Sequence, residues 1–315
     1  MTERLTPNYA PQASGVAPPM VSVCIPTWKD AAIPLLTSLG AMQANEAFEV
    51  LIYDDGSGDP AMTAKIERAL QEMNTQATLI TASSNQGRSH ARNRLIEHAR
   101  ADWVLLLDAD MLPDSAQFLH TYIQSVQDDP TPALIAGGFT LKQVEASSGQ
   151  SLHAAQSEKS ECIPAEKRAE NPGLHVFTSN ILVHREILDG INFDEGYVGW
   201  GWEDVDWGLR VARQYPVRHI ENTATHLGLD DAADLIKKYE NSSANFARLA
   251  ERHPAEVTQM KLYKAAKRLA GIPGRSMIRA CAKMLAKDAT GLLPLSLRLF
   301  SLKMFRAATY AEDLK

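Results

Sequence analysis

Short apolar runs alternate with longer amphipathic stretches along the first half of the chain. Four runs have the length and the aliphatic or β-branched content of strands buried on both faces: Val21–Ile25, Glu49–Tyr53, Ala77–Thr81 and Trp103–Leu107. Helical stretches lie between them, at Ile33–Met42, Ala61–Met73 and Gln86–Ala99. Strands of this kind that alternate with helices predict an α/β fold, with a mostly parallel sheet covered by helices.

The second half of the chain predicts a less regular order of elements. The segment Lys142–Pro172 is polar and is expected to be a long surface excursion, for which a lid and a featureless insertion are equally open. We expect two strands, a loop followed by a helix, and a polar helix: His175–Val183, Val217–Thr225, Gly196–Arg213 and Ala232–Arg252.

Composition and charge narrow the class of protein. The chain has 315 residues, 45% of them hydrophobic, which is enough for a full core. A net charge of −6 argues against a general nucleic-acid partner. We expect no secretory signal and no bilayer-spanning stretch, because no apolar run is long enough. The three cysteines lie far apart, which argues against a disulfide framework. These features suit a cytoplasmic protein.

Changes in composition predict three parts of the chain. We expect a disordered leader at residues 1–19, one α/β domain at 20–230 and a helical, basic C-terminal extension at 231–315. Between residues 260 and 306 the chain has eleven Lys and Arg residues and one acid, Asp288, with apolar residues interleaved. This composition is typical of helices that lie peripherally on an anionic membrane, here the cytoplasmic face of the inner membrane. The alternative is a solvated helical tail packed on the catalytic domain.

Carboxylates directly follow two of the predicted strands. Asp54 and Asp55 come after the second strand, and Asp108 and Asp110 come after the fourth. Ligands of open α/β sheets bind at the carboxyl ends of the strands. Two carboxylates two residues apart, as in Asp108 and Asp110, can point the same way from an extended backbone, and two hard oxygen ligands suit Mg²⁺ or Mn²⁺. A turn with helix-capping aspartates is the alternative for Asp108 and Asp110.

Four segments together resemble the family 2 glycosyltransferases of the GT-A fold: Val21–Thr27, Tyr53–Ser57, Asn85–Asn93 and Leu107–Asp110. They occur in the order and at the separations typical of that family, and the resemblance extends from about Val21 to Asp230. It implies a Rossmann-like mixed sheet flanked by helices and a nucleotide-sugar donor, with uracil as the expected base. It also implies a divalent cation, Mn²⁺ or Mg²⁺, and inversion at the anomeric carbon.

The resemblance assigns donor-binding roles to residues at the strand ends. Pro26 and Thr27 would line the nucleotide pocket. Asp55, with Asp54 beside it, would accept a hydrogen bond from an N–H of the base, although one of the two could cap the following turn. Arg88 would meet the diphosphate, because it stands at a helix start where backbone N–H groups also bind phosphate. For Arg92 and Asn93 the sequence leaves open whether they bind phosphate or have a structural role.

The resemblance also implies a cation site made by Asp108, Asp110 and His226, with Asp108 near the diphosphate as well. His226 ends the last predicted strand, and imidazole is a reasonable Mn²⁺ ligand. A structural histidine is the alternative. His90, His184 and His219 have no comparable support.

A second cluster of acids and aromatics lies in Gly196–Arg210. It resembles the Gly-Trp-Gly-x-Glu-Asp segment of galactosyltransferases and N-acetylgalactosaminyltransferases. That resemblance implies that Asp204 is the general base and that Glu203 holds the acceptor, while Trp200 and Trp202 offer flat faces to a sugar. Trp202 departs from the pattern, in which a small residue is commoner at this position. The alternative is a helix N-terminus enriched in acids, and Asp206 and Trp207 are expected to be structural.

The sequence thus predicts a metal-dependent, inverting glycosyltransferase that moves a sugar to a glycan, polysaccharide or glycolipid. One alternative is a haloacid-dehalogenase-like phosphohydrolase, since its nucleophile motif also places Asp-x-Asp after an apolar strand. In that class the strand usually opens the domain, whereas three predicted strands precede the strand Trp103–Leu107 here. The other alternative is a non-catalytic carbohydrate-binding relic of the fold.

Overall fold

The structure, a computed structural model, describes residues 3–6, 19–42, 48–73 and 75–314. These residues fall into two compact units, each assembled from several pieces of the sequence. The first unit comprises the chain up to Val144, Cys162–Gly196 and Trp207–Gly228, and the second comprises Glu145–Glu161, Tyr197–Asp206 and Leu229–Lys315. The chain passes from the first unit to the second for the last time between Gly228 and Leu229, close to the boundary that the composition predicts near residue 230. The composition does not indicate the earlier passages between the units.

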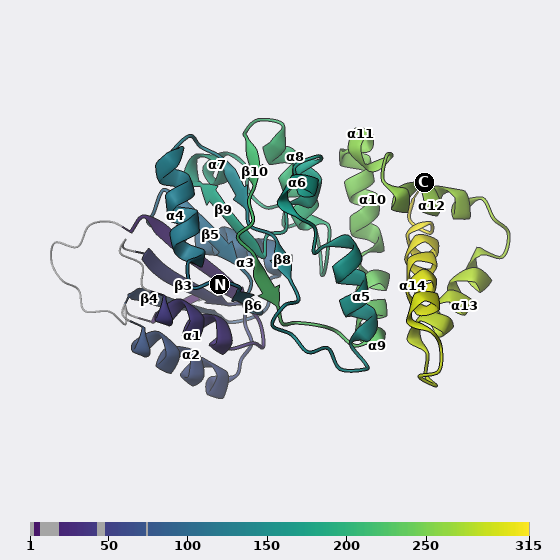
Figure 1. The fold of residues 1–315 in the computed structure, drawn as a ribbon, viewed down its shortest axis with the longest axis horizontal. Coiled ribbons are helices and arrows are strands. Elements are labelled where there is room, and N and C mark those ends of the chain that lie inside the picture. The colour runs from purple at the N-terminus through teal and green to yellow at the C-terminus, as the bar shows by residue number, and fades with distance from the viewer. Residues whose placement is uncertain (1–2, 7–18, 43–47, 74, 315) are drawn as a thin grey trace. The chain divides into compact units, whose positions relative to one another are not determined.

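A mixed sheet forms the centre of the first unit (Figure 1). Within the described residues its strand order is β1-β4-β3-β2-β5-β9-β7-β10. The four strands that the apolar runs predict are parallel neighbours, whereas β1 and β9 run antiparallel to the strands beside them. The strands are β1 (Glu3–Thr6), β2 (Val21–Thr27), β3 (Phe48–Asp54), β4 (Gln76–Ala82), β5 (Trp103–Leu107), β7 (Leu134–Ala136), β9 (Asn180–His184) and β10 (Val217–His219).

Apolar side chains fill both faces of this sheet, because successive residues of a strand point to opposite sides. On one face, Ile52 and Leu105 belong to a core shared with helices α1 (Ile33–Ala41), α2 (Pro60–Glu72) and α4 (Phe118–Asp128). On the other face, Leu51 and Leu106 pack with α3 (Arg88–His98), α7 (Arg185–Gly190) and the end of α8 (Glu203–Ala212). Burial on both sides explains why these strands read as continuous apolar runs.

A smaller sheet in the same unit corrects one sequence prediction. Its order is β6-β11-β8, from Met111–Pro113, Ala224–His226 and Phe139–Thr140. The predicted strand Val217–Thr225 is therefore two short strands in different sheets, divided where the Asn222 side chain donates to the Phe118 carbonyl at 2.9 Å. Separately, the predicted strand His175–Val183 is shorter than expected, because β9 of the large sheet begins only at Asn180 and His175 ends a 3₁₀ helix, η1 (Pro172–His175).

Helices make up the second unit. They are α5 (Ser151–Ser160), α9 (Ala232–Asn241), α10 (Ser243–Arg252), α11 (Pro254–Val257), α12 (Lys261–Ala270), α13 (Arg275–Lys287) and α14 (Leu295–Tyr310). Leu152 of α5, Ile236 of α9 and Phe305 of α14 share one buried core. The polar helix predicted at Ala232–Arg252 is broken at Ser242, whose hydroxyl donates to the Tyr239 carbonyl.

The polar excursion at 142–172 contains α5 and a short helix of the first unit, α6 (Ala165–Arg168). The predicted disordered leader falls mostly outside the described residues. Its described part, Glu3–Thr6, departs from the prediction, because it pairs with β4 and Glu3 binds Arg94 through both carboxylate oxygens, at 2.8 and 2.7 Å. Among the helices of the described ranges, none combines the length and the hydropathy needed to cross a bilayer.

Candidate active site

The carboxyl ends of three parallel strands bring predicted site residues to one edge of the sheet. Thr27, the last residue of β2, lies opposite Asp54, the last residue of β3. The backbone N–H of Asp55 donates to the Thr27 carbonyl at 2.9 Å, so the two loops leave the sheet together. β5 runs parallel to β2 and leads directly into Asp108. This edge is where open α/β sheets bind ligands.

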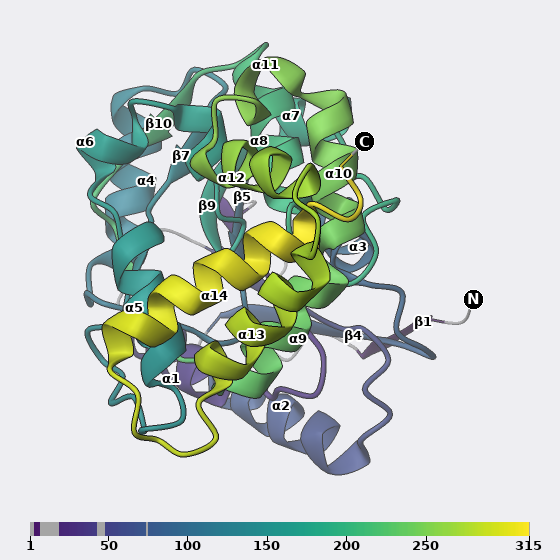
Figure 2. The same cartoon turned by 90° about the vertical axis from the view of Figure 1, so that its right-hand side faces the viewer.

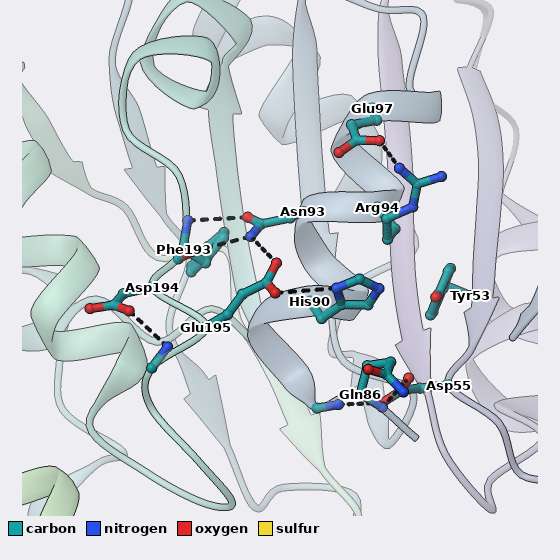
Figure 3. Close-up of polar contacts among 12 residues, drawn as sticks. Tyr53, Asp55, Gln86, His90, Asn93, Arg94, Glu97, Phe193, Asp194 and Glu195 are labelled. Carbon is teal, nitrogen blue, oxygen red and sulfur yellow. Dashed lines mark hydrogen bonds and ion pairs between the residues drawn. The ribbon is translucent and has the colours of Figure 1, made fainter. Parts of the chain in front are cut away.

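The two aspartates after β3 hold loops in place. Asp54 accepts a hydrogen bond from the Ser57 N–H at 3.0 Å, which caps the turn. Asp55 accepts from Gln86 and Gly87, at 2.9 and 2.8 Å, and so fixes the loop that leads into α3 (Figure 3). Burial raises the pKa of Asp55 against the effect of these two hydrogen bonds. Each carboxylate oxygen of Asp55 keeps a second lone pair with which it could accept from a nucleobase.

Asp110 and His226 meet at the end of the small sheet. Oδ2 of Asp110 lies 3.2 Å from Nε2 of His226, and both side chains are part-exposed. Burial alone would raise the pKa of Asp110, but the hydrogen bond with His226 and the nearby positive charges of His226 and Arg88 outweigh it, and the pKa is lowered. Gly228 makes the arrangement possible, because a Cβ there would stand 2.1 Å from Oδ2 of Asp110.

Asp108 is held by a buried arginine. Nη2 of Arg92, which is 2% exposed, donates to Oδ1 of Asp108 at 3.0 Å. In the described ranges no three His, Cys, Asp or Glu side chains are grouped as metal ligands would be. Asp110 and His226 meet as a pair, and Arg92 occupies one oxygen of the Asp108 carboxylate. This contact gives Arg92 the structural role that the sequence left open.

Arg88, the first residue of α3, is exposed. Gly87 before it has φ of 98°, a conformation that glycine adopts at no steric cost. The charge of Arg88 acts on Asp110, so the predicted phosphate-binding arginine and the Asp-x-Asp motif share one neighbourhood.

Side chains of α3 also anchor the loop after α7, which sequence patterns did not indicate. Figure 3 shows Glu195 reaching between Asn93 and His90. Asn93 exchanges hydrogen bonds with the Phe193 backbone at 3.1 Å in each direction and donates to Glu195 at 3.0 Å, while His90 lies 3.3 Å from Glu195. Asn93 thus has a structural role. Partners a hundred residues apart leave no signal in a single sequence.

In the second unit, an unusual backbone presents the acidic cluster. Gly199, Gly201 and Trp202 have φ of 80°, 92° and 77°. This region suits glycine but strains a tryptophan. Asn245 of α10 donates to the carbonyls of Val198 and Gly201, both at 3.0 Å, and so fixes the loop.

Trp202 is a packing residue, which corrects its expected role as an acceptor platform. Its indole is buried, packs on the rings of Phe246 and Tyr310, and donates to the Tyr310 hydroxyl at 3.2 Å. Trp200 is only part-buried and packs beside Tyr239.

The acids at the start of α8 differ in their surroundings. Glu203 is buried and Asp204 is part-exposed, with Oδ1 accepting from the Val205 N–H at 2.8 Å. Asp206 is fully buried beside His253, whose Nε2 lies 2.9 Å from its Oδ1. In the first unit, Trp207 donates to the Ile191 carbonyl at 2.7 Å. Asp206 and Trp207 are thus both buried and bound to other groups of the protein, which favours the structural roles predicted for them.

The family model of glycosyl transferase family 2 matches residues 22–191, which is more than half of the chain. The chain belongs to glycosyl transferase family 2. The predicted family and the α/β class with a mixed sheet and a helical C-terminal region are thereby confirmed. The assignment also decides against the haloacid-dehalogenase-like phosphohydrolase.

Two curated relatives are described as uncharacterized glycosyltransferases. The one from Haemophilus influenzae is 27% identical over 114 residues, covering 35% of this chain and 36% of its own length. YfnE from Bacillus subtilis is 23% identical over 240 residues, covering 60% of this chain and 59% of its own. The chain thus spans between about a third and three fifths of these relatives.

Solved structures share the fold at low identity. The mannosyltransferase PcManGT from Pyrobaculum calidifontis, in complex with GDP-Man and Mn²⁺, superposes with a TM-score of 0.59 at 16% identity and covers 94% of this chain and 88% of its own. S. aureus TarS 1–349 in complex with UDP gives a TM-score of 0.51 at 15% identity, covering 93% and 90%. At these identities the likeness shows the fold alone.

Proposed function

We propose that this family 2 glycosyltransferase transfers a sugar from a UDP-sugar to a hydroxyl of a glycan, polysaccharide or glycolipid, with inversion and with a bound divalent cation. The observation that carries the proposal is the pairing of Asp110 with His226, which lies within reach of the charge of Arg88 at the start of α3. Asp55 holds the loop that leads into the same helix. Solved structures of this fold include complexes with GDP-Man and Mn²⁺ and with UDP, which supports a nucleotide-sugar donor.

The first unit supplies the proposed donor residues. Pro26 and Thr27 lie at the end of β2, and Asp55 at the end of β3 has lone pairs left for an N–H of uracil. Arg88 supplies positive charge at the N-terminus of α3, where an anion is favoured by the helix dipole. These groups would hold the nucleotide and its diphosphate.

Residues of this unit fit a divalent cation. The pKa of Asp110 is lowered, which favours its ligand form, and Gly228 leaves room around its carboxylate. A carboxylate and an imidazole nitrogen together suit Mn²⁺. Asp110 and His226 would hold the ion, with Asp108 fixed beside them by Arg92. When bound, the cation supplies positive charge that stabilises the diphosphate leaving group.

Asp204 is the proposed general base. Its carboxylate would take the proton of the acceptor hydroxyl as that oxygen bonds to the anomeric carbon and the bond to the diphosphate oxygen breaks. Attack from the face opposite the leaving group inverts the anomeric configuration. Glu203 and Trp200 are proposed to hold the acceptor, the first by hydrogen bonds and the second by its apolar ring face.

Calorimetric titration of the full chain with UDP, with and without Mn²⁺, tests the donor site. We expect Mn²⁺-dependent UDP binding that Asp110→Ala removes. The matched control Asp128→Ala, at an exposed aspartate that ends α4, should bind as the wild type does. If UDP fails to bind under either condition, a uracil donor is wrong, and GDP is the next nucleotide to titrate.

A screen of UDP-sugars with glycan acceptors then tests the reaction. Asp204→Asn should abolish UDP release and product formation, and it should leave UDP affinity nearly unchanged. Retained transfer in this variant would remove Asp204 from the role of base. The anomeric configuration of the product, measured by NMR, decides between inversion and retention.

A further inference from the structure

The C-terminal helices of the second unit expose an unusual share of the chain's large apolar side chains. Ten such side chains are exposed in the described residues, and seven of them lie between Ile272 and Phe300. They are Ile272 (43% exposed), Met277 (69%), Met284 (66%), Leu292 (83%), Leu295 (40%), Leu297 (39%) and Phe300 (62%). Scattered exposed apolar residues are ordinary, but a contiguous group marks an interaction surface.

These exposed side chains do not belong to the core of the unit, because α13 and α14 form that core with their opposite faces. Ala282 and Ala286 of α13, and Leu299 and Phe305 of α14, belong to the core that these helices share with α9. Met277, Ala280, Cys281 and Met284 recur at helical spacing on the exposed side of α13. Leu297 and Phe300 do the same on α14. Folding of the unit does not account for this outer face.

Basic side chains surround the apolar ones. The exposed positions of α12 include Lys261, Lys264, Lys267 and Arg268. Lys287 and Lys303 are exposed beside the apolar positions of α13 and α14. Figure 2 shows α12, α13 and α14 together in front, and α14 packs against both other helices. The three helices thus form one surface that is apolar in part and positively charged in part.

We propose that this surface, made by the outer faces of α12, α13 and α14, docks on an anionic lipid bilayer. Met277, Met284, Leu297 and Phe300 would enter the headgroup–acyl boundary, while the lysines and Arg268 meet lipid phosphates. The charge selects this partner, because each basic residue near an anionic leaflet is attracted to it. Six basic side chains of these helices are exposed: Lys261, Lys264, Lys267, Arg268, Lys287 and Lys303. Apolar burial and electrostatic attraction together give interfacial binding. The proposal does not depend on the donor, the cation or the base.

Vesicle flotation of the full chain tests the proposal. We expect the protein to float with mixed phosphatidylcholine–phosphatidylglycerol vesicles but not with pure phosphatidylcholine vesicles, and to be released as salt screens the attraction. Deletion of residues 260–315 is unsuitable, because α14 supplies Leu302 and Phe305 to the core of its unit. Exposed-site substitutions keep that core intact.

Two variants with matched controls separate charge from apolar burial. Lys287→Glu with Lys303→Glu should lower vesicle affinity at least about tenfold, and Phe300→Ser should lower it severalfold. The controls are Lys65→Glu with Arg68→Glu, on the exposed face of α2, and Leu5→Ser in β1. They make the same change in net charge and a comparable loss of an exposed apolar side chain, but in the first unit. UDP titration and thermal unfolding of each variant check that it is folded.

Three results would overturn the proposal. Failure of the folded wild type to float with the mixed vesicles is the first. Equal loss of binding in the surface variants and their controls is the second, since it would show a general charge effect. In the third, the wild type sediments as a dimer, Phe300→Ser sediments as a monomer and neither binds vesicles, which would assign the surface to a second copy of the chain.

Discussion

Oδ2 of Asp110 lies 3.2 Å from Nε2 of His226, although the two residues are far apart in the chain. The contact depends on β11 pairing with β6 in the small sheet, so that His226 stands opposite Met111. Gly228, two residues beyond His226, leaves the space that the carboxylate of Asp110 occupies. The proposed cation site is therefore a property of one small sheet and the glycine that follows it.

Gly228→Ala should damage the cation site without unfolding the protein. The added Cβ would stand 2.1 Å from Oδ2 of Asp110 and would displace that carboxylate. We expect Mn²⁺-dependent UDP affinity to fall about 10- to 100-fold, the range seen when the support of a metal ligand is lost. Gly190→Ala is the matched control, because nothing lies within 4 Å of a Cβ there. Equal affinity in both variants would contradict the role of Gly228.

Arg92→Met should destabilise the first unit. Arg92 is buried, and its guanidinium lies 3.0 Å from the carboxylate of Asp108. Its loss would leave this part-buried carboxylate without the positive charge of the guanidinium. We expect the free energy of unfolding in urea to fall by about 2–4 kcal/mol, somewhat less than for a fully buried pair. Arg68→Met, on the exposed side of α2, should change it by about 0.5 kcal/mol or less. A similar small change in both variants would show that the pair is not stabilising.

The stability of the first unit should depend on pH through Asp114. Burial would raise the pKa of Asp114, but hydrogen bonds donated by Thr225, Thr223 and Thr140 outweigh it and lower the pKa. A lowered pKa contributes stability above the unfolded value of about 3.9, and that contribution is lost as the pH falls through the folded value. Asp114→Asn should therefore cost about 1–3 kcal/mol near neutral pH.

Urea unfolding across a pH series measures this effect. The difference between wild type and Asp114→Asn should shrink as the pH falls below the unfolded pKa of the carboxyl. The exposed control Asp128→Asn should track the wild type at every pH. A gap between wild type and Asp114→Asn that stays constant into acid would mean that ionisation of Asp114 does not stabilise the fold.

Trp202→Ala separates packing from acceptor binding. Relief of the strained backbone at φ 77° should regain only part of the stability that is lost with the buried indole, its contacts with the rings of Phe246 and Tyr310, and its hydrogen bond to Tyr310. We expect a net loss of about 3 kcal/mol or more in the free energy of unfolding. A stable variant with a raised KM for the acceptor would instead indicate that Trp202 binds the acceptor.

The sequence predicted the elements whose pattern is local. β2, β3, β4 and β5 were recognisable because burial on both faces makes each an uninterrupted apolar run. The helix α4 was missed although Phe118, Tyr122 and Val126 recur at helical spacing, a signal that was available. β6, β8 and β11 were beyond prediction, since strands of two or three residues are defined by their partners and not by their composition.

In the candidate site, too, residues with a local sequence pattern were predictable and contacts between distant residues were not. Residue types and order indicated Asp55 and Asp110, because carboxylates after apolar strands gather at the carboxyl ends of a sheet. The resemblance to the family added His226. The competition of Arg92 for Asp108 and the hold of Asn93 on Glu195 were not predictable, because each joins side chains whose proximity only the folded chain creates.

The assembly of the second unit from three separate stretches has a consequence for synthesis. A growing chain leaves the ribosome in order, so Glu145–Glu161 and Tyr197–Asp206 emerge before most of their native partners exist. Tyr310, which accepts the indole N–H of Trp202, is added 108 residues later. At about 5–20 residues per second this delay is roughly 5–20 s. During that time Trp202 lacks Tyr310, and translation speed rather than final stability sets how long its ring is open to chaperones or to aggregation.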